Sequence, residues 1–317
     1  SSDLASASSQ RPATLGVMGG GQLGRMFVHA AQAMGYRTVV LDPDPHSPAG
    51  QAADEHILGD YLDEACLQRL SQACDAVTTE FENVPAAALS QMARTHAVAP
   101  SAKSVAVCQH RALEKARFVA SGVPCVPFGV LESDADIDKL DDSLFPAVLK
   151  TSTLGYDGKG QARVQTRDAL LAAWQALGAG PCLLEKQVSL QAEFSVIVAR
   201  NARGECVHLP VQQNLHRQGI LATTQVPAPD LTAQARTLAS AYADRLASDL
   251  DYVGVLCVEF FLLTDGRILA NEMAPRPHNS GHYSIDACDI SQFELQVRAM
   301  AGLPLVQPSL QIGRAHV

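Results

Sequence analysis

The stretch Thr14-Leu-Gly-Val-Met-Gly-Gly-Gly-Gln-Leu-Gly24 decides the fold of the first part of the chain. Its apolar start predicts a buried strand, and the glycines that follow predict a tight turn into a helix. Apolar residues then recur at the i, i+3, i+4, i+7, i+11 spacing of one helix face, at Leu23, Met26, Phe27, Ala30 and Met34, and Gly35 ends the helix. Strands predicted at 38–41 and 76–79, with a helix at about 62–73 between them, complete a βαβαβ unit and therefore an open parallel sheet.

The glycine turn permits two interpretations. Gly19, Gly21 and Gly24 have the spacing of a dinucleotide-binding fingerprint, and Asp42 ends the second predicted strand. An NAD-dependent oxidoreductase is therefore one candidate function. Glycines at the start of a helix also allow other ligands to approach its amides, however, and nothing downstream indicates a hydride-transfer site.

The second part of the chain has a different pattern. A helix predicted at 111–121 ends at Gly122-Val-Pro124, which indicates a boundary. Beyond it we expect strands at 146–150, 181–185, 193–199 and 207–210, interrupted by helices near 166–177 and 232–250. The sequence therefore predicts an α/β domain followed by an α+β domain.

A hairpin near the end of this part brings two carboxylates together. The apolar run 253–263 and the return strand 267–273 are separated by Asp265-Gly266, which predicts a two-residue type I′ turn with Thr264 facing Arg267. Five pairs further back, Glu259 then faces Glu272. Two like charges that face each other on neighbouring strands are destabilising unless a cation lies between them, and oxygen ligands suit Mg²⁺. The alternative is that both glutamates point to solvent.

Two polar clusters complete the candidate site. Thr151-Ser-Thr-Leu-Gly-Tyr-Asp-Gly-Lys-Gly-Gln161 follows a strand that ends in Lys150, and its three glycines predict a mobile loop whose amides cover phosphates. A plain hairpin loop is the alternative. Asn214-Leu-His-Arg-Gln-Gly-Ile220 carries His216, for which a surface role is also open.

Composition excludes several classes of function. The 317 residues are 47% hydrophobic and 18% charged, as in ordinary globular proteins. A net charge of −9 without any Lys/Arg-rich run argues against nucleic acid as a partner. No stretch reaches transmembrane length, so we expect no membrane partner. Eight cysteines without a Cys-x-x-Cys pair predict reduced thiols and a cytoplasmic protein.

Five motifs together resemble one family of enzymes. They are Gly-Gly-Gly-Gln-Leu-Gly-Arg-Met, Thr-Glu-Phe-Glu-Asn, Gly-Tyr-Asp-Gly-Lys-Gly-Gln, Asn-Leu-His-Arg-Gln-Gly-Ile and Asn-Glu-Met-Ala-Pro-Arg-Pro-His-Asn-Ser-Gly-His. In this order they resemble the 5-(carboxyamino)imidazole ribonucleotide synthetases, ATP-grasp ligases of purine biosynthesis, from about residue 14 to 307. The resemblance implies a Rossmann-like pre-ATP-grasp domain followed by an ATP-grasp domain. It also implies that ATP and bicarbonate form carboxyphosphate, which carboxylates 5-aminoimidazole ribonucleotide; a non-catalytic nucleotide-binding module is a further alternative.

The resemblance implies a role for each candidate residue. The ATP-binding residues are then Arg111, Lys150, Gly155, Tyr156, Asp157, Gly158, Lys159, Gly160, Gln161, Glu185, Lys186, Gln187, Val188, Glu193, His216, Asn271 and Glu272, with Glu259 and Glu272 on Mg²⁺. The substrate-binding residues are Gln22, Leu23, Glu80, Arg276, His278, Asn279 and Ser280. Catalytic roles fall on Tyr156, Asp157, Lys159 and Arg276. Lys159 stands where many members have Arg, which keeps the charge but loses the bidentate geometry.

The expected organisation follows from the same resemblance. We expect a disordered tail at 1–13, the pre-ATP-grasp domain at 14–107 and the ATP-grasp domain at 108–307, with a lid at about 145–205. Family members continue beyond Leu303-Pro-Leu305 into a small β-rich domain, whereas 308–317 match nothing in the family. We therefore expect this form to keep the ATP site and to bind the ribonucleotide poorly. A homodimer is left open.

Overall fold

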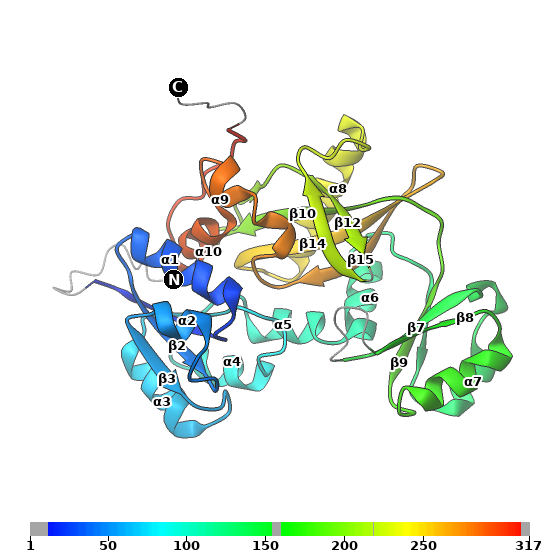
Figure 1. Ribbon diagram of the computed structural model, residues 1–317, viewed down its shortest axis with the longest axis horizontal. Coiled ribbons are helices and arrows are strands. Elements are labelled where there is room, and N and C mark those ends of the chain that lie inside the picture. The colour runs from blue at the N-terminus through cyan, green and yellow to red at the C-terminus, as the bar shows by residue number, and fades with distance from the viewer. Residues whose placement is uncertain (1–11, 154–159, 218, 312–317) are drawn as a thin grey trace.

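The computed structural model describes residues 12–153, 160–217 and 219–311. Figure 1 shows three units: an N-terminal α/β unit, a central sheet, and a smaller lid unit that projects to one side. Within the described residues, no helix is long and apolar enough to cross a membrane. All eight cysteines lie in these ranges and are free thiols.

The N-terminal unit is the predicted parallel sheet, enlarged to five strands. The strand order is β3-β2-β1-β4-β5, and every adjacent pair is parallel. Its elements are β1 (Thr14–Met18), α1 (Gln22–Ala33), β2 (Arg37–Asp42), α2 (Pro48–Ala52), β3 (Glu55–Leu58), α3 (Glu64–Ala73), β4 (Ala76–Thr79), α4 (Ala86–Met92) and β5 (Ala97–Val98). Helix α2 and strand β3 were not predicted, because the prolines there indicate a break in the chain. Pro48 instead starts α2. Proline has no amide hydrogen, and the first turn of a helix offers no carbonyl partner for one.

The central sheet is the larger of the two sheets in the second part of the chain. Its strands β10 (Leu190–Arg200), β12 (Gln212–Arg217), β13 (Ile220–Gln225), β14 (Gly254–Leu263) and β15 (Ile268–Ala274) lie in the order β13-β12-β10-β14-β15, and β11 (Cys206–His208) pairs with β10. Helix α8 (Ala233–Asp249) covers one face, where Ala243 and Leu246 join the core around Phe194 and Phe260.

The lid unit is a four-stranded antiparallel sheet with a core of its own. It contains β6 (Phe128–Leu131), the 3-10 helices η2 (Asp134–Lys139) and η3 (Asp142–Leu144), β7 (Ala147–Thr151), β8 (Gln161–Val164), α7 (Arg167–Ala176) and β9 (Cys182–Lys186), in the strand order β6-β9-β7-β8. Trp174 packs in this core beside Leu149 and Leu184. The predicted lid range of 145–205 thus leaves out β6 and includes β10, which belongs to the central sheet. The predicted domain boundaries stay proposals.

Helices connect the three units. Helices α5 (Ala102–Cys108) and α6 (Arg111–Ala120) lead from the N-terminal unit to the lid, and η4 (Asn279–Gly281), α9 (Ser284–Ala287) and α10 (Gln292–Ala301) follow β15. Helix α10 returns to the N-terminal unit, where Phe293 and Val297 share a core with Leu15. Gln296 accepts a hydrogen bond from Val255 N and donates to Thr78 Oγ1, so it joins the central sheet to the parallel sheet.

The hairpin of β14 and β15 turns differently from the prediction. Gly266 N donates to Leu263 O and Leu263 N to Arg267 O, so the loop has three residues and the predicted two-residue turn is wrong. The Asp265 carboxylate accepts from Arg267 N, which stabilises this longer loop, and Gly266 takes a left-handed φ of +84°. A β-bulge beside Asn271 then shifts the register by one residue. Glu259 therefore does face Glu272 as predicted, because the extra loop residue and the β-bulge shift the register by one residue in opposite directions.

Candidate active site

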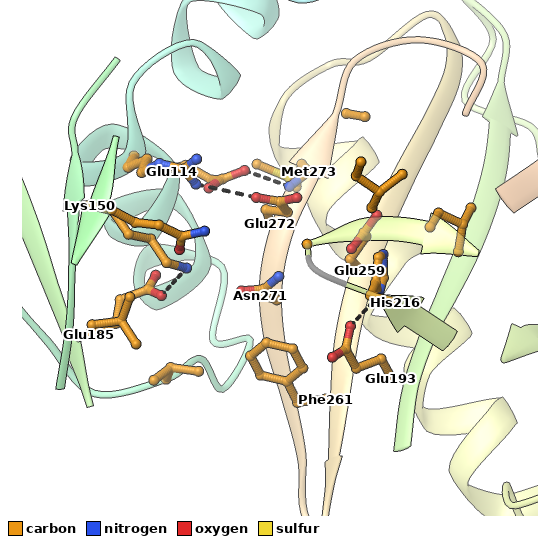
Figure 2. A pocket seen from close by; sticks show the side chains of 18 of the residues that line it. Glu114, Lys150, Glu185, Glu193, His216, Glu259, Phe261, Asn271, Glu272 and Met273 are labelled. Atoms are coloured by element: carbon orange, nitrogen blue, oxygen red, sulfur yellow. Dashed lines mark hydrogen bonds and ion pairs between the residues drawn. The ribbon is translucent and has the colours of Figure 1, made fainter. Parts of the chain in front are cut away.

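A cavity of about 1330 Å³ lies between the lid unit and the central sheet. Figure 2 shows Lys150 and Glu185 on its lid side, Asn271 and Glu272 on β15, and Glu193 and His216 across from the lid. The candidate residues that line it are Arg111, Lys150, Gly160, Gln161, Glu185, Lys186, Gln187, Val188, Glu193, His216, Glu259, Asn271, Glu272, Arg276, His278 and Asn279. The structure therefore gathers most of the predicted site from five separate stretches of sequence.

A buried group of two lysines and one carboxylate forms the lid side. Glu185 on β9 pairs with Lys150 on β7 through one oxygen, and its other oxygen lies 2.8 Å from Lys115 Nζ on α6. Burial raises the pKa of the Glu185 carboxyl, but the two ammonium groups outweigh it and lower the pKa to about 2. Lys150, at the end of β7, is therefore already paired with a carboxylate, and the group of two lysines and Glu185 keeps one net positive charge next to the cavity.

A second ion pair joins the start of α6 to β15. Arg111 Nη1 lies 3.2 Å from Glu272 Oε2, and Arg111 N donates to Ser152 O of the lid at 2.9 Å. Beside it, the buried Glu114 accepts a hydrogen bond from Met273 N. Burial, aided by the charge of Glu272, raises the pKa of Glu114 to about 8.

The carboxylates of the hairpin fit a cation that arrives with a phosphate ligand. Glu259 and Glu272 are register partners, and the side-chain oxygen of Asn271 is buried without a hydrogen-bond partner. This unpaired amide oxygen and the two carboxylates are oxygen donors of the kind that Mg²⁺ prefers. Among the described residues, no three His, Cys, Asp or Glu side chains form a ready-made metal cluster. The remaining ligands of such an ion must therefore come from elsewhere.

An acid–histidine pair lies at the far side of the cavity. His216 Nδ1 on β12 is 2.6 Å from Glu193 Oε2 on the adjacent strand β10. The Glu193 carboxylate, which accepts a hydrogen bond from the imidazole ring, raises the pKa of His216. Adjacent strands in antiparallel register hold these two side chains together, so neither is an isolated surface residue.

The loop after β15 faces the N-terminal unit. Arg276 forms an ion pair with Glu82, and His278 Nε2 lies 3.1 Å from Glu259 Oε1. Burial disfavours the charge on His278, but the sulfur of Cys257 and the Glu259 carboxylate raise its pKa to about 10. The cavity therefore has two cations, Arg276 and His278, where the N-terminal unit meets the central sheet.

The glycine turn already contains its own anions. The Asp42 carboxylate accepts from Gly20 N at 2.7 Å, and the Glu80 carboxylate accepts from Gly21 N at 2.9 Å and Gly24 N at 3.0 Å. Amides that would face a pyrophosphate are thus bonded to protein carboxylates. This arrangement removes the physical basis for the dinucleotide interpretation.

Some candidate residues lie away from the cavity. Gln22 and Leu23 are at the start of α1, Glu80 is buried against the glycine turn, and Ser280 is buried behind His278, 2.9 Å from its Nδ1. None of these four lines the cavity. Gly155, Tyr156, Asp157, Gly158 and Lys159 lie outside the described residues.

Four residues that line the cavity or lie directly behind it were not predicted from the sequence. They are Glu82, Glu114, Lys115 and Gln109, whose side-chain amide donates to Glu82 O and Val84 O at 2.6 Å. A signal existed for two of them. Phe118 is the buried apolar anchor of α6, and Arg111, Glu114 and Lys115 share its helix face at the i, i+3, i+4, i+7 spacing.

These features define an ATP-grasp enzyme: a cavity large enough for a nucleotide, between an antiparallel lid and a sheet whose edge strand carries a carboxylate. An ATP-grasp domain model matches residues 116–293, and a ribonucleotide synthetase preATP-grasp domain model matches 12–109.

Named relatives refine this class. The N5-carboxyaminoimidazole ribonucleotide synthase of Brucella melitensis is 43% identical over 295 residues, covering 92% of this chain and 81% of the relative. The Bacillus subtilis enzyme of the same name is 40% identical over 300 residues, covering 94% and 78%. A crystal structure of an ADP complex of the synthetase has a TM-score of 0.90 at 40% identity, covering 95% and 80%. The Aspergillus clavatus enzyme with ADP and 5-aminoimidazole ribonucleotide has a TM-score of 0.86 at 32% identity, covering 93% and 78%.

The chain belongs to the N5-carboxyaminoimidazole ribonucleotide synthase family and is an ATP-grasp ligase. The predicted fold and family are confirmed. The oxidoreductase alternative finds no support in these comparisons.

Proposed function

We propose that this chain carboxylates 5-aminoimidazole ribonucleotide with bicarbonate, using ATP and Mg²⁺, and that carboxyphosphate is the intermediate. Bicarbonate is a poor electrophile, and phosphorylation gives it a leaving group. The exocyclic amine of the ribonucleotide then takes the carboxyl group, and the products are N5-carboxyaminoimidazole ribonucleotide, ADP and phosphate. The comparisons with family members bound to ADP and to the ribonucleotide support this proposal.

The distribution of charge across the cavity carries the proposal. Arg111 and Lys150 provide cations from α6 and the lid, whereas Asn271 and Glu272 provide oxygen donors from β15. A triphosphate in the cavity would be bound by these cations, and the oxygen donors would hold the Mg²⁺ that neutralises its charge. Catalysis of phosphoryl transfer depends mainly on such positioning and charge neutralisation.

Each side of the cavity has a distinct proposed role. Residues 185–188 on and after β9 face the adenine, and Glu193 with His216 holds the ribose end. Glu259, Asn271 and Glu272 would hold Mg²⁺, which would neutralise charge on the phosphates. Gly160 and Gln161 end the loop that is expected to exclude water from carboxyphosphate.

The ribonucleotide is proposed to bind near Arg276, His278 and Asn279. Arg276 and protonated His278 offer two cations for its phosphate or for the carboxyl donor. Glu82 approaches the same place from the N-terminal unit, so this part of the cavity lies at the domain interface. The roles predicted for Gln22, Leu23, Glu80 and Ser280 remain proposals, as do those for Tyr156, Asp157 and Lys159.

One assay tests the function. Phosphate release from Mg·ATP is measured with bicarbonate, in the presence and absence of 5-aminoimidazole ribonucleotide. Turnover that depends on the ribonucleotide and yields the carboxylated product is expected. ATP binding without turnover would instead indicate a nucleotide-binding module.

The surroundings of the protein are also proposals. The eight free thiols support a cytoplasmic location, which cell fractionation tests. The open edge strand β3 and the exposed Leu58 and Leu62 beside it support a homodimer. Sedimentation equilibrium of the wild type and of Leu62→Asp measures it: only the wild type should have twice the monomer mass.

A further inference from the structure

Helix α6 buries charge and exposes apolar side chains. Lys115 is 1% exposed, whereas Leu113 and Val119 of the same helix are 51% and 61% exposed. A buried ammonium is strongly unfavourable unless it is fully paired. The position of Lys115 therefore calls for a specific partner.

Lys115 connects the lid to the central sheet from behind the cavity. Its Nζ lies 2.8 Å from Glu185 Oε1 on β9 and donates to Asn271 O on β15 at 2.7 Å. It also lies 5.6 Å from the ring centroid of Phe118. Lys150 lines the cavity and Lys115 does not. Glu185 is thus held between a lysine that a ligand can reach and one that a ligand cannot reach.

The charge of this group explains why two lysines are needed. If Lys150 were the only partner of Glu185, the carboxylate would cancel the positive charge of Lys150. Moving Lys150 to a phosphate would then leave a buried, unpaired carboxylate, which is strongly unfavourable. With Lys115 in place, each oxygen of Glu185 has its own cation, and one of the two lysines can leave.

We infer that Lys115 is a positioning residue that neutralises Glu185 from behind, so that Lys150 is available to the phosphates of the nucleotide. This inference rests on the proposed binding of ATP in the cavity. It assigns to α6 a role in selecting phosphorylated ligands, although Lys115 itself touches none.

A structural strut would behave differently. If Lys115 only joins α6, β9 and β15, its loss should weaken every ligand of the cavity alike. If it neutralises Glu185, its loss should weaken only ligands that carry phosphates, and removal of the Glu185 charge should reverse the effect.

The experiment compares dissociation constants for ATP and adenosine by titration calorimetry. The measured quantity is the selectivity, Kd(adenosine) divided by Kd(ATP), which cancels any effect of Glu185 on adenine. Lys115→Met keeps the length of the side chain and should lower the selectivity at least about tenfold. Lys115→Met combined with Glu185→Gln should restore it to within about threefold of Glu185→Gln alone. Arg117→Met, which removes a charge from the same helix without touching Glu185, should leave it unchanged.

Several outcomes would overturn the inference. Equal weakening of ATP binding and adenosine binding in Lys115→Met would show that Lys115 has only a structural role. A double variant that does not recover the selectivity would show the same. If Lys115→Met does not fold, Glu185→Gln alone decides, because it should keep the wild-type selectivity or raise it. A lower selectivity there would show that Lys150 needs Glu185. Failure of the wild type to bind ATP would instead refute the proposed function.

Discussion

Glu114→Gln should make the protein more stable, and increasingly so as the pH rises. The carboxylate of Glu114 is 2% exposed and accepts a hydrogen bond from Met273 N, which the amide oxygen of glutamine can replace. Its pKa is raised from 4.5 to about 8, chiefly by burial. The substitution therefore removes the ionisation and retains the contact.

The magnitude follows from linkage between protonation and folding. Between pH 4.5 and 8 the folded protein keeps a proton on Glu114 that the unfolded chain has lost. The free energy of unfolding therefore falls as the pH rises through this window, by about 1.4 kcal/mol per pH unit at most. The wild type should lose on the order of 4 kcal/mol relative to Glu114→Gln between pH 5 and pH 8.5.

Urea unfolding of both proteins at pH 5, 6, 7, 8 and 8.5 measures this difference. Glu132→Gln, at an exposed position, controls for the general effect of exchanging the two side chains. A difference between wild type and Glu114→Gln that stays constant with pH would refute the reasoning, because it would mean that Glu114 ionises alike in the folded and unfolded states.

Three further predictions concern the site and the glycine turn. Glu272→Gln should lower kcat at least about 100-fold while circular dichroism and the unfolding midpoint stay near wild type, since it removes a charge proposed to hold Mg²⁺; near-normal turnover would contradict this role. Arg276→Ala should raise the KM of the ribonucleotide about 10- to 100-fold and that of ATP far less, because the lost charged hydrogen bonds are proposed to serve only the former; an effect on ATP alone would show the assignment to be wrong. Gly19→Ala should lower the free energy of unfolding by about 2 kcal/mol or more, because φ is +109° and a Cβ would lie 2.4 Å from Cγ of Glu80; thermal unfolding measures the loss, with Gly35→Ala, also at positive φ but with no atom within 4 Å, as the control for backbone strain alone.

Local patterns were sufficient for the elements that depend on neighbours in the sequence. The period of apolar residues predicted α1 and the strands β1, β2 and β4, because burial of one helix face or of a whole strand needs only that spacing. The motifs were sufficient to indicate the family, which the comparisons show.

The hairpin marks where local reasoning ends. The predicted turn was wrong, and the facing of Glu259 and Glu272 depends on the bulge beside Asn271. Two side chains satisfy backbone groups beside this bulge. Lys115 donates a hydrogen bond to Asn271 O, and Glu114 accepts one from Met273 N. Both come from a helix about 156 residues earlier in the chain, which no local pattern can reveal.

By itself, the sequence determined the succession of strands and helices and the family to which the chain belongs, because both follow from spacings along the chain. The tertiary structure alone decided which charges meet. Lys115 and Lys150 both pair with Glu185. The carboxylates of Asp42 and Glu80 accept hydrogen bonds from the amides of the glycine turn. Burial makes such pairings obligatory, and the partners are fixed by how the lid, the central sheet and the parallel sheet pack together.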